Sequence, residues 1–430
     1  MKRIWAIALF AGCITMVTFT SAYAETLNEA VTTLIQEHNR VQAARADLAA
    51  ANERIRVSMK KWFPQANLTA WAGRENRESA NALKTRLTAK ELDVQISQLL
   101  WDFGESGSEI DEARLRHEAS QAQLESAMQE VILEGVTAYL GLKRAEEVLK
   151  YAKQSEANIK RQTEMENTRV EKGLGYSTDV LQAKTQLLGA QARKARAEGA
   201  VTRAKNRVVA VFNRPANDIS DLDMGAVPFG LLPATLDEAR QTALESNPSL
   251  RDSLINVQIT RERIRGERGK GYYPTLNAVL EYKSKEDVES IIGNRDEKVA
   301  KVELTFPFNL GFTSVNAVKA AQQDNVAASE KYEYNMDLIT EDAFNAWSNL
   351  ETARQNAGLL RDQADIVAEF LESARKEQQM GRRSLLDVLS GETALINAQS
   401  DAAAAEADIA ISVFTLLKAM GKLDIGVIGG

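Results

Sequence analysis

The chain repeats itself at an interval of about 208 residues, and this repeat limits the folds that it can adopt. Leu27-Asn28-Glu29-Ala30 recurs 209 residues later as Leu236-Asp237-Glu238-Ala239. Asp179-Val180-Leu181 recurs 208 residues later as Asp387-Val388-Leu389, and matching Thr, Leu, Ala and Gln residues follow both copies. Solenoid proteins repeat every 20 to about 50 residues, so this longer period indicates a duplicated domain. The sequence therefore predicts two halves built on one plan.

The N-terminus has the features of a secretory signal peptide. A basic Met1-Lys2-Arg3 precedes an apolar run from Ile4 to Phe19, and Ala22-Tyr23-Ala24 provides a small-x-small cleavage site. This pattern predicts a signal peptide over residues 1–24. An alternative is lipoprotein cleavage before Cys13, although Phe10 stands where an aliphatic residue is expected.

Composition excludes several classes of function. Cys13 would leave with the signal peptide, so the mature chain would have no thiol chemistry or disulfide, and only two histidines remain. Loss of Lys2 and Arg3 leaves 51 of the 53 basic residues against 60 acidic ones, a balance that disfavours nucleic acid as a partner. We find no nucleophile, metal or cofactor motif, and we expect neither an enzyme nor a cofactor. After the signal, no apolar run reaches the ~20 residues of a membrane-spanning helix.

Long helices are predicted between the prolines. No proline occurs between Pro64 and Pro215 or after Pro307, and these tracts carry sustained heptads of mostly small residues. A helix over 105–172 would be about 100 Å long at about 1.5 Å per residue. Shorter helices stacked end to end would match such a long partner. The predicted helices are 27–61, 105–172 and 178–212 in the first half, and 235–270, 312–380 and 384–421 in the second.

Two strands are predicted in each half, between the first short helix and the long helix. Residues 91–97 and 301–306 alternate strictly between apolar and polar side chains, which indicates strands with one apolar and one wet face. The wet face carries full charges, which suits a water-filled lumen. Aromatic residues are expected near the strand ends, as in membrane barrels: Trp62, Phe63, Trp71, Trp101, Tyr272, Tyr273 and Phe306. An alternative is a small soluble sheet that covers a helix bundle.

Four strands from one chain cannot close a membrane barrel, and an open edge is not tolerated in lipid. If the strands are transmembrane, the protein must therefore be an oligomer, and three copies would supply twelve strands. The predicted organisation has a first repeat over 25–215, with strands about 64–100 and a hairpin at 105–213. A linker follows over 216–234. The second repeat covers 235–422, with strands about 273–307 and a hairpin at 312–421, and 423–430 form a tail.

The sequence resembles the TolC family of outer-membrane factors over essentially the whole mature chain. The resemblance rests on this architecture and on the signature Gly-x-x-x-x-x-Asp-Val-Leu, present at 173–181 and 381–389. It implies a mainly α protein with a membrane β-barrel part, in which a homotrimer forms a twelve-stranded barrel in the outer-membrane lipid and an α-helical tunnel in the periplasm. The implied partners are a periplasmic adaptor and an inner-membrane pump, either ABC-type or proton-driven.

The expected function is that of an exit duct for type I protein secretion. The main alternative is small-molecule or multidrug efflux, and a soluble periplasmic coiled-coil scaffold is an alternative from another class.

The resemblance also implies roles for the hairpin turns. Gly173, Leu174, Gly381 and Arg382 match the tips where an adaptor docks. Asp387, Arg383, Asp179 and Thr178 match the closed periplasmic entrance, where Arg383 would bond to Thr178 and Asp179. Ser390 stands where the family has a second Asp, so a ring of acidic side chains at the entrance would carry fewer charges. Gln378 stands where the family has a Tyr that helps to hold the entrance closed, so part of that contact would be missing. Helix capping explains Asp179 and Asp387 equally well, since each lies in the first turn of a predicted helix.

Overall fold

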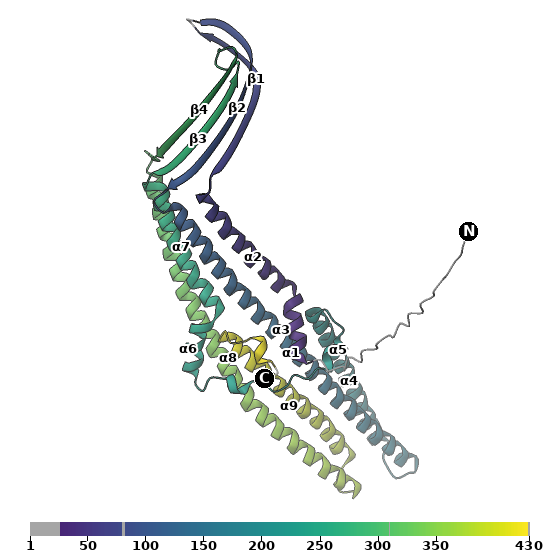
Figure 1. The fold of residues 1–430 in the computed structure, drawn as a ribbon. Helices are drawn as coiled ribbons and strands as arrows, with labels where there is room; N and C mark the ends of the chain where they lie inside the picture. The colour runs from purple at the N-terminus through teal and green to yellow at the C-terminus, as the bar shows by residue number, and fades with distance from the viewer. Residues whose placement is uncertain (1–25, 80–81, 309, 429–430) are drawn as a thin grey trace, which may run out of the picture.

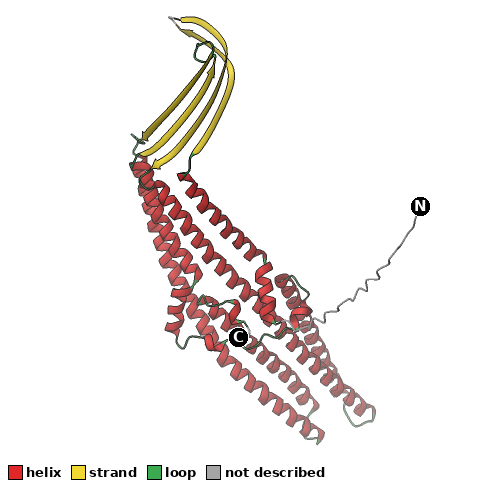
Figure 2. Cartoon of the chain, in the orientation of Figure 1, coloured by secondary structure: helices red, strands yellow, loops and turns green. Residues whose placement is uncertain are grey.

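The computed structural model describes residues 26–79, 82–308 and 310–428, and the predicted signal peptide with Cys13 lies outside them. The molecule is elongated, with a four-stranded sheet at one end and long helices that continue away from it (Figures 1 and 2). Both halves of the chain contribute strands to the sheet and helices to the part that continues away from it.

The two halves contain the same elements in the same order. The first half comprises α1 (Leu27–Glu37), α2 (Asn39–Met59), β1 (Gln65–Ser79), β2 (Ala82–Trp101), α3 (Glu105–Glu171) and α4 (Ser177–Phe212). The second half comprises α6 (Leu236–Ser246), α7 (Pro248–Tyr272), β3 (Thr275–Glu286), β4 (Asn294–Thr305), α8 (Thr313–Gln379) and α9 (Leu385–Ala419). The short α5 (Ala216–Ser220) lies between the halves, inside the segment predicted as a linker.

Two predicted helices are each divided in the structure. The predicted helix 27–61 breaks at His38, which has extended backbone (ψ 127°) and accepts a bond from Arg40 N through Nδ1 at 3.2 Å. The predicted helix 235–270 breaks at Asn247, which precedes Pro248 and has ψ 121°. Proline disfavours helical backbone in the residue before it and lacks the N–H that a continuing helix needs. The single-helix predictions were therefore wrong at these two positions.

The strands form one antiparallel sheet in the order β1-β2-β3-β4. The two halves meet at its centre, where Val94 of β2 pairs with Tyr282 of β3. Each outer strand is paired on one side: Leu68 of β1 with Val94, and Val302 of β4 with Ala278 of β3. Four strands, two from each half, were predicted from the sequence; the structure confirms them and shows that they pair antiparallel.

Aromatic side chains gather at the foot of the sheet, where strands pass into helices. Phe103 stacks on Tyr273 with ring centroids 5.4 Å apart, and Trp101 meets Phe103 edge-on at 6.2 Å. Phe103 and its second-half counterpart Phe312 both have left-handed backbone, with φ of 54°. Trp71 is an exception to the prediction, because it lies inside β1 and donates from Nε1 to Glu91 Oε2 at 3.1 Å.

Each long helix packs along two shorter ones. The 67-residue α3 contacts α2 and α4, and the 67-residue α8 contacts α7 and α9. The shorter helices of each half follow one another along their long partner (Figure 1), as their lengths predicted. Helix α3 also contacts α7 and α9, which joins the halves. Most heptad positions of α8 are buried, as expected, and three are half-buried (Ala353, Leu360 and Val367). The buried ones are Ala343, Ala346, Leu350, Ala357, Ala364, Leu371 and Ala374.

The main apolar core lies where the shorter helices meet. It includes Leu27 and Ile35 of α1, Ile132 of α3 and Phe414 of α9, all at most 1 % exposed. Tyr139 also belongs to this core, and its hydroxyl donates a hydrogen bond to the carbonyl oxygen of Leu222 at 2.8 Å. Among the helices of the described residues, none is long and apolar enough to cross a membrane.

Candidate functional site at the hairpin tips

The two hairpins turn through the same backbone structure. Gly173 and Gly381 have φ of 72° and 74°, the left-handed conformation predicted for these glycines. Leu174 N bonds to Arg169 O and Arg382 N bonds to Glu377 O, each at 2.9 Å. A second bond from each glycine N, also at 2.9 Å, reaches the carbonyl of the residue three positions earlier. Both long helices therefore end in a Schellman motif.

The predicted adaptor-docking residues are exposed at these tips. Leu174 is 69 % exposed and Arg382 is also exposed. A Cβ added at Gly173 or Gly381 would meet nothing within 4 Å. Tyr176 and Met380, at 76 % and 60 % exposure, enlarge the apolar part of this surface. The tips therefore offer accessible apolar side chains on rigid turns, and their docking role stays a prediction.

Arg383 is held within its own hairpin. Its Nε donates to Glu377 Oε2 at 2.7 Å, and its guanidinium lies 5.3 Å from the centroid of the Phe370 ring. In the described part of this single chain, Arg383 makes no hydrogen bond to Thr178 or Asp179. The bond implied by the family resemblance therefore stays a prediction that concerns the assembled protein.

Both predicted entrance aspartates lie in the first turn of a helix. Asp387 is exposed, and its backbone N donates to the N-cap hydroxyl of Ser384 at 3.2 Å. This bond is one half of a capping box, and it agrees with the capping interpretation of Asp387. Asp179 lies at the third position of α4, where the helix dipole favours a carboxylate. Capping and a role at the entrance are compatible for both residues.

The structure adds a buried polar cluster above the tips that the sequence analysis missed. Glu392 of α9 is 2 % exposed and accepts bonds from Arg375 of α8 and from Asn158 of α3, the latter at 3.4 Å. Nearby, Arg193 of α4 donates to Thr393 Oγ1 at 3.2 Å. The available signal was the place of Glu392 on the apolar face of its helix, three residues after Leu389 and four before Ile396.

Burial also disfavours the charged form of Arg193, beside this cluster. Desolvation lowers the pKa of the Arg193 guanidinium, and the neighbouring Arg196 lowers it further. Arg193 Nε is buried, and it has no hydrogen-bond partner among the described residues. Neutral Thr393 is its partner on the other hairpin, so this arginine connects the hairpins at some cost in solvation.

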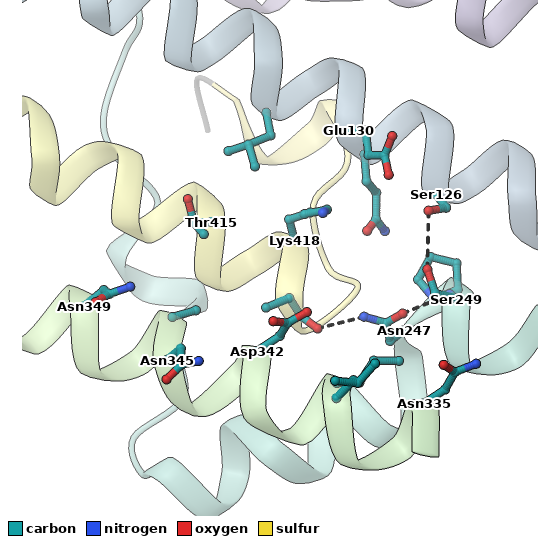
Figure 3. Close-up of a pocket in the computed structure, with 17 residues that line it drawn as sticks. Ser126, Glu130, Asn247, Ser249, Asn335, Asp342, Asn345, Asn349, Thr415 and Lys418 are labelled. Atoms are coloured by element: carbon teal, nitrogen blue, oxygen red, sulfur yellow. Dashed lines mark hydrogen bonds between the residues drawn. The ribbon is translucent and has the colours of Figure 1, made fainter. Parts of the chain in front are cut away.

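A separate cavity of about 510 Å³ lies where the start of α7 meets the end of α9 (Figure 3). Residues of α3, α7, α8 and α9 line it. Asn247 Nδ2 bonds to Ala419 O at 2.9 Å and ties the two helix ends together. Glu130, on its wall, pairs with Arg40 at 2.7 Å. The cavity lies at the gap between the ends of α7 and α9. Among the described residues, no cluster of His, Cys, Asp and Glu side chains could hold a metal ion.

Comparison with known proteins agrees with this architecture. The family model described as outer membrane efflux protein matches residues 30–214 and 239–422, well over half of the chain. The chain belongs to this family. The two matched segments lie within the two halves of the chain, so each half separately resembles the model of the outer membrane efflux protein family.

Individual relatives match over most of their length. Outer membrane efflux protein BepC of Brucella suis is 22 % identical over 427 residues, covering 99 % of this chain and 91 % of BepC. Outer membrane protein TolC of Vibrio cholerae is 25 % identical over 430 residues, covering 98 % and 96 %. Alkaline protease secretion protein AprF of Pseudomonas aeruginosa is 24 % identical over 344 residues, covering 77 % and 69 %.

The fold is shared with solved channels. The Campylobacter jejuni CmeC outer membrane channel superposes with a TM-score of 0.79 at 16 % identity, covering 94 % of this chain and 88 % of CmeC. This member of the outer membrane efflux protein family is thus an outer-membrane channel protein whose helical part lies in the periplasm.

Proposed function

We propose that three copies of this chain form a channel-tunnel that serves as the exit duct of a tripartite export system. The observation that carries the assembly is an uncovered apolar face on α4. Leu181 and Leu188 are 64 % and 67 % exposed, whereas their second-half counterparts Leu389 and Ile396 are 0 % and 4 % exposed. The counterparts are buried because α9 packs on α3 of the same chain.

The partner for the α4 face follows from the repeat. The second-half counterpart of α3 is α8, so α8 of a neighbouring copy is the equivalent partner for α4. On α8, Leu359 and Ile366 are 69 % and 67 % exposed in the single chain. A head-to-tail contact of this kind generates a ring when the rotation closes. Three copies would join the outer strands β1 and β4 of neighbours into a closed sheet of twelve strands.

This assembly is tested by substitution at the uncovered face. Leu188→Glu should lower the temperature at which the detergent-purified oligomer dissociates, because it buries a carboxylate in an apolar contact. Met165→Glu is the matched control, since Met165 is 50 % exposed and its counterpart Ser373 is exposed as well. Equal dissociation temperatures for both variants would contradict the proposed contact. A monomeric wild-type protein that leaves membranes without detergent would instead favour the periplasmic scaffold.

The cargo that we propose is protein, delivered by type I secretion through a periplasmic adaptor and an inner-membrane pump. Support comes from the similarity to AprF, whose name describes secretion of an alkaline protease. Small-molecule efflux is the second candidate, favoured by the similarity to BepC. In both cases the chain conducts cargo passively and catalyses no reaction.

Deletion of the gene in its own host separates the two cargoes. Loss of a protein from the culture medium, with unchanged accumulation of a fluorescent efflux dye, would support secretion. Raised dye accumulation with an unchanged set of secreted proteins would overturn it and support efflux.

A further inference from the structure

The two faces of the ribbon formed by β1 and β2 differ in charge. The register of the two strands, in which Arg74 pairs with Thr88, places the even-numbered residues of both strands on one face. Over residues 65–77 and 85–97, all the acidic side chains lie on the other face: Glu75, Glu91 and Asp93. The even-numbered face of these segments therefore carries no negative charge, and it is the face that the proposed closed sheet turns toward lipid.

This face changes from apolar to basic with distance from the helices (Figure 1). Its part nearest the helices is apolar: Ala66, Leu68, Ala70 and Ala72 of β1, with Leu92, Val94 and Ile96 of β2. Beyond it lies a group that we call the basic patch, whose members are all exposed: Arg74 and Asn76 of β1, with Arg86 and Thr88 of β2.

The basic patch lies at the height of lipid headgroups. Arg74 is eight residues beyond Ala66, which is about 26 Å along a strand and about 20 Å of height at a tilt of about 40°. The apolar band of a membrane barrel is about 25 Å tall, and arginine side chains extend toward its edge. Because the helical part lies in the periplasm, this edge belongs to the outer leaflet.

The basic patch has the chemistry of a phosphate site. Arg74 pairs with Thr88 and Asn76 pairs with Arg86, so the two arginines are diagonal neighbours on one face. Such neighbours are about 7–8 Å apart, within reach of long side chains. Neither arginine forms an ion pair with a described residue. Guanidinium groups bind phosphate through paired hydrogen bonds, and the Thr88 hydroxyl and the Asn76 amide add further donors.

The ribbon formed by β3 and β4 carries acidic residues at the corresponding place. Glu286 and Asp296 lie on the same face as the basic patch. Glu286 pairs with Lys90 at 3.0 Å, and Asp296 accepts a bond from Ser284 Oγ at 2.9 Å. Lys90 is thus neutralised, whereas the two patch arginines keep their charge. The excess positive charge is confined to the first ribbon, which gives one site in each copy.

We propose that the basic patch binds the phosphate group of a phosphorylated lipid in the outer leaflet of the outer membrane. This inference deepens the proposed function and rests on the closed sheet of three copies. The acyl chains lie along the apolar part of the same face. A hollow of about 490 Å³ offers room for one of them beside the patch, and its lining includes Ala72, Lys90 and Leu92. The bound lipid anchors the far end of the sheet at the membrane surface.

Native mass spectrometry of the delipidated oligomer in detergent tests this site with lipid A as the probe. Wild type should bind one lipid A in each copy, and lipid A stripped of its phosphates should bind about tenfold more weakly. The double variant Arg74→Gln, Arg86→Gln should also bind lipid A about tenfold more weakly, because charge-assisted bonds are lost. The matched control Arg77→Gln, Lys301→Gln removes two positive charges from the other face and should leave binding unchanged.

Equal losses in the two double variants, or equal affinity for the dephosphorylated lipid, would overturn the proposal. Displacement of lipid A by equimolar inorganic phosphate would overturn it as well, since the site would then recognise the free anion. The patch variant should dissociate at the wild-type temperature; a lower temperature would assign the arginines to the contact between copies instead. The same spectra count the copies. Trimers without lipid A contradict this inference alone, whereas the absence of trimers contradicts the proposed function.

Discussion

Arg383 and Glu377 lie across the turn between α8 and α9, and Arg383 Nε donates to Glu377 Oε2 at 2.7 Å. The arginine is therefore positioned by its own hairpin before any contact with another copy. Its neighbour Arg382 is exposed and forms no ion pair among the described residues. Two adjacent arginines thus differ in whether an ion pair fixes the side chain, which makes them a matched pair for experiment.

Arg383→Ala should raise single-channel conductance in planar bilayers, because loss of the guanidinium removes the bonds that would hold the entrance closed. Each exposed ion pair contributes only about 0.2–1 kcal/mol, so we expect a shift in the closed-to-open ratio and not a permanently open pore. Arg382→Ala is the control and should leave conductance unchanged. Identical traces for both variants would reduce Arg383 to a residue of the local turn.

Leu174→Asp should weaken binding of the periplasmic adaptor, since it places a charge in the apolar surface of the tip. Leu174 is 69 % exposed, so the substitution removes little side-chain packing within the chain. Leu231→Asp serves as the control, because Leu231 is 56 % exposed and lies in the segment between α5 and α6, outside both hairpins. Co-purification of the adaptor with each variant measures the effect. Equal yields would remove Leu174 from the docking surface.

Gly381→Ala should destabilise the second tip by about 1 kcal/mol, because a side chain disfavours left-handed backbone. A Cβ at Gly381 meets nothing within 4 Å, so strain at φ 74° is the whole effect. Gly358→Ala, also open to solvent but inside α8, should instead stabilise by about 0.5–1 kcal/mol. Thermal denaturation would reveal the opposite signs. Two changes of the same sign would show that the φ angle is not decisive.

Asp252→Asn should stabilise the protein at neutral pH and have no effect in strong acid. Burial raises the pKa of the Asp252 carboxyl above its ordinary value of 3.8, and the bond from Gln123 at 3.2 Å offsets this only in part. The folded state thus binds this proton more tightly than the unfolded state. The resulting stability is complete below pH 3.8 and is lost as pH rises through the raised pKa.

Unfolding of wild type and Asp252→Asn across this pH range checks the sign. The two curves should coincide in acid and separate as pH rises. Asp324→Asn, on the exposed face of α8, is the control. A constant difference at every pH would show that the substitution acts through packing and not through ionisation.

Much of the fold could be predicted from local patterns. Heptads of small residues indicated long paired helices, strict alternation indicated the strands, and Gly173 and Gly381 indicated the turns. The breaks at His38 and Asn247 were missed, because a single extended residue leaves the helical pattern on both sides intact. Pro248 was the sequence signal for the break at Asn247. The break at His38 is seen only in the ψ angle of that residue.

By itself the amino-acid sequence determined the duplication, the helices and strands, and the tip glycines, because these depend on backbone preferences and on periodicity along the chain. The tertiary structure alone decided which equivalent positions are buried. Glu392 and Lys184 occupy the same place in the two repeats, yet α3 covers only Glu392. Desolvation and partner geometry arise when distant helices meet, so no pattern within one helix could distinguish a buried charge that joins two hairpins from an exposed one.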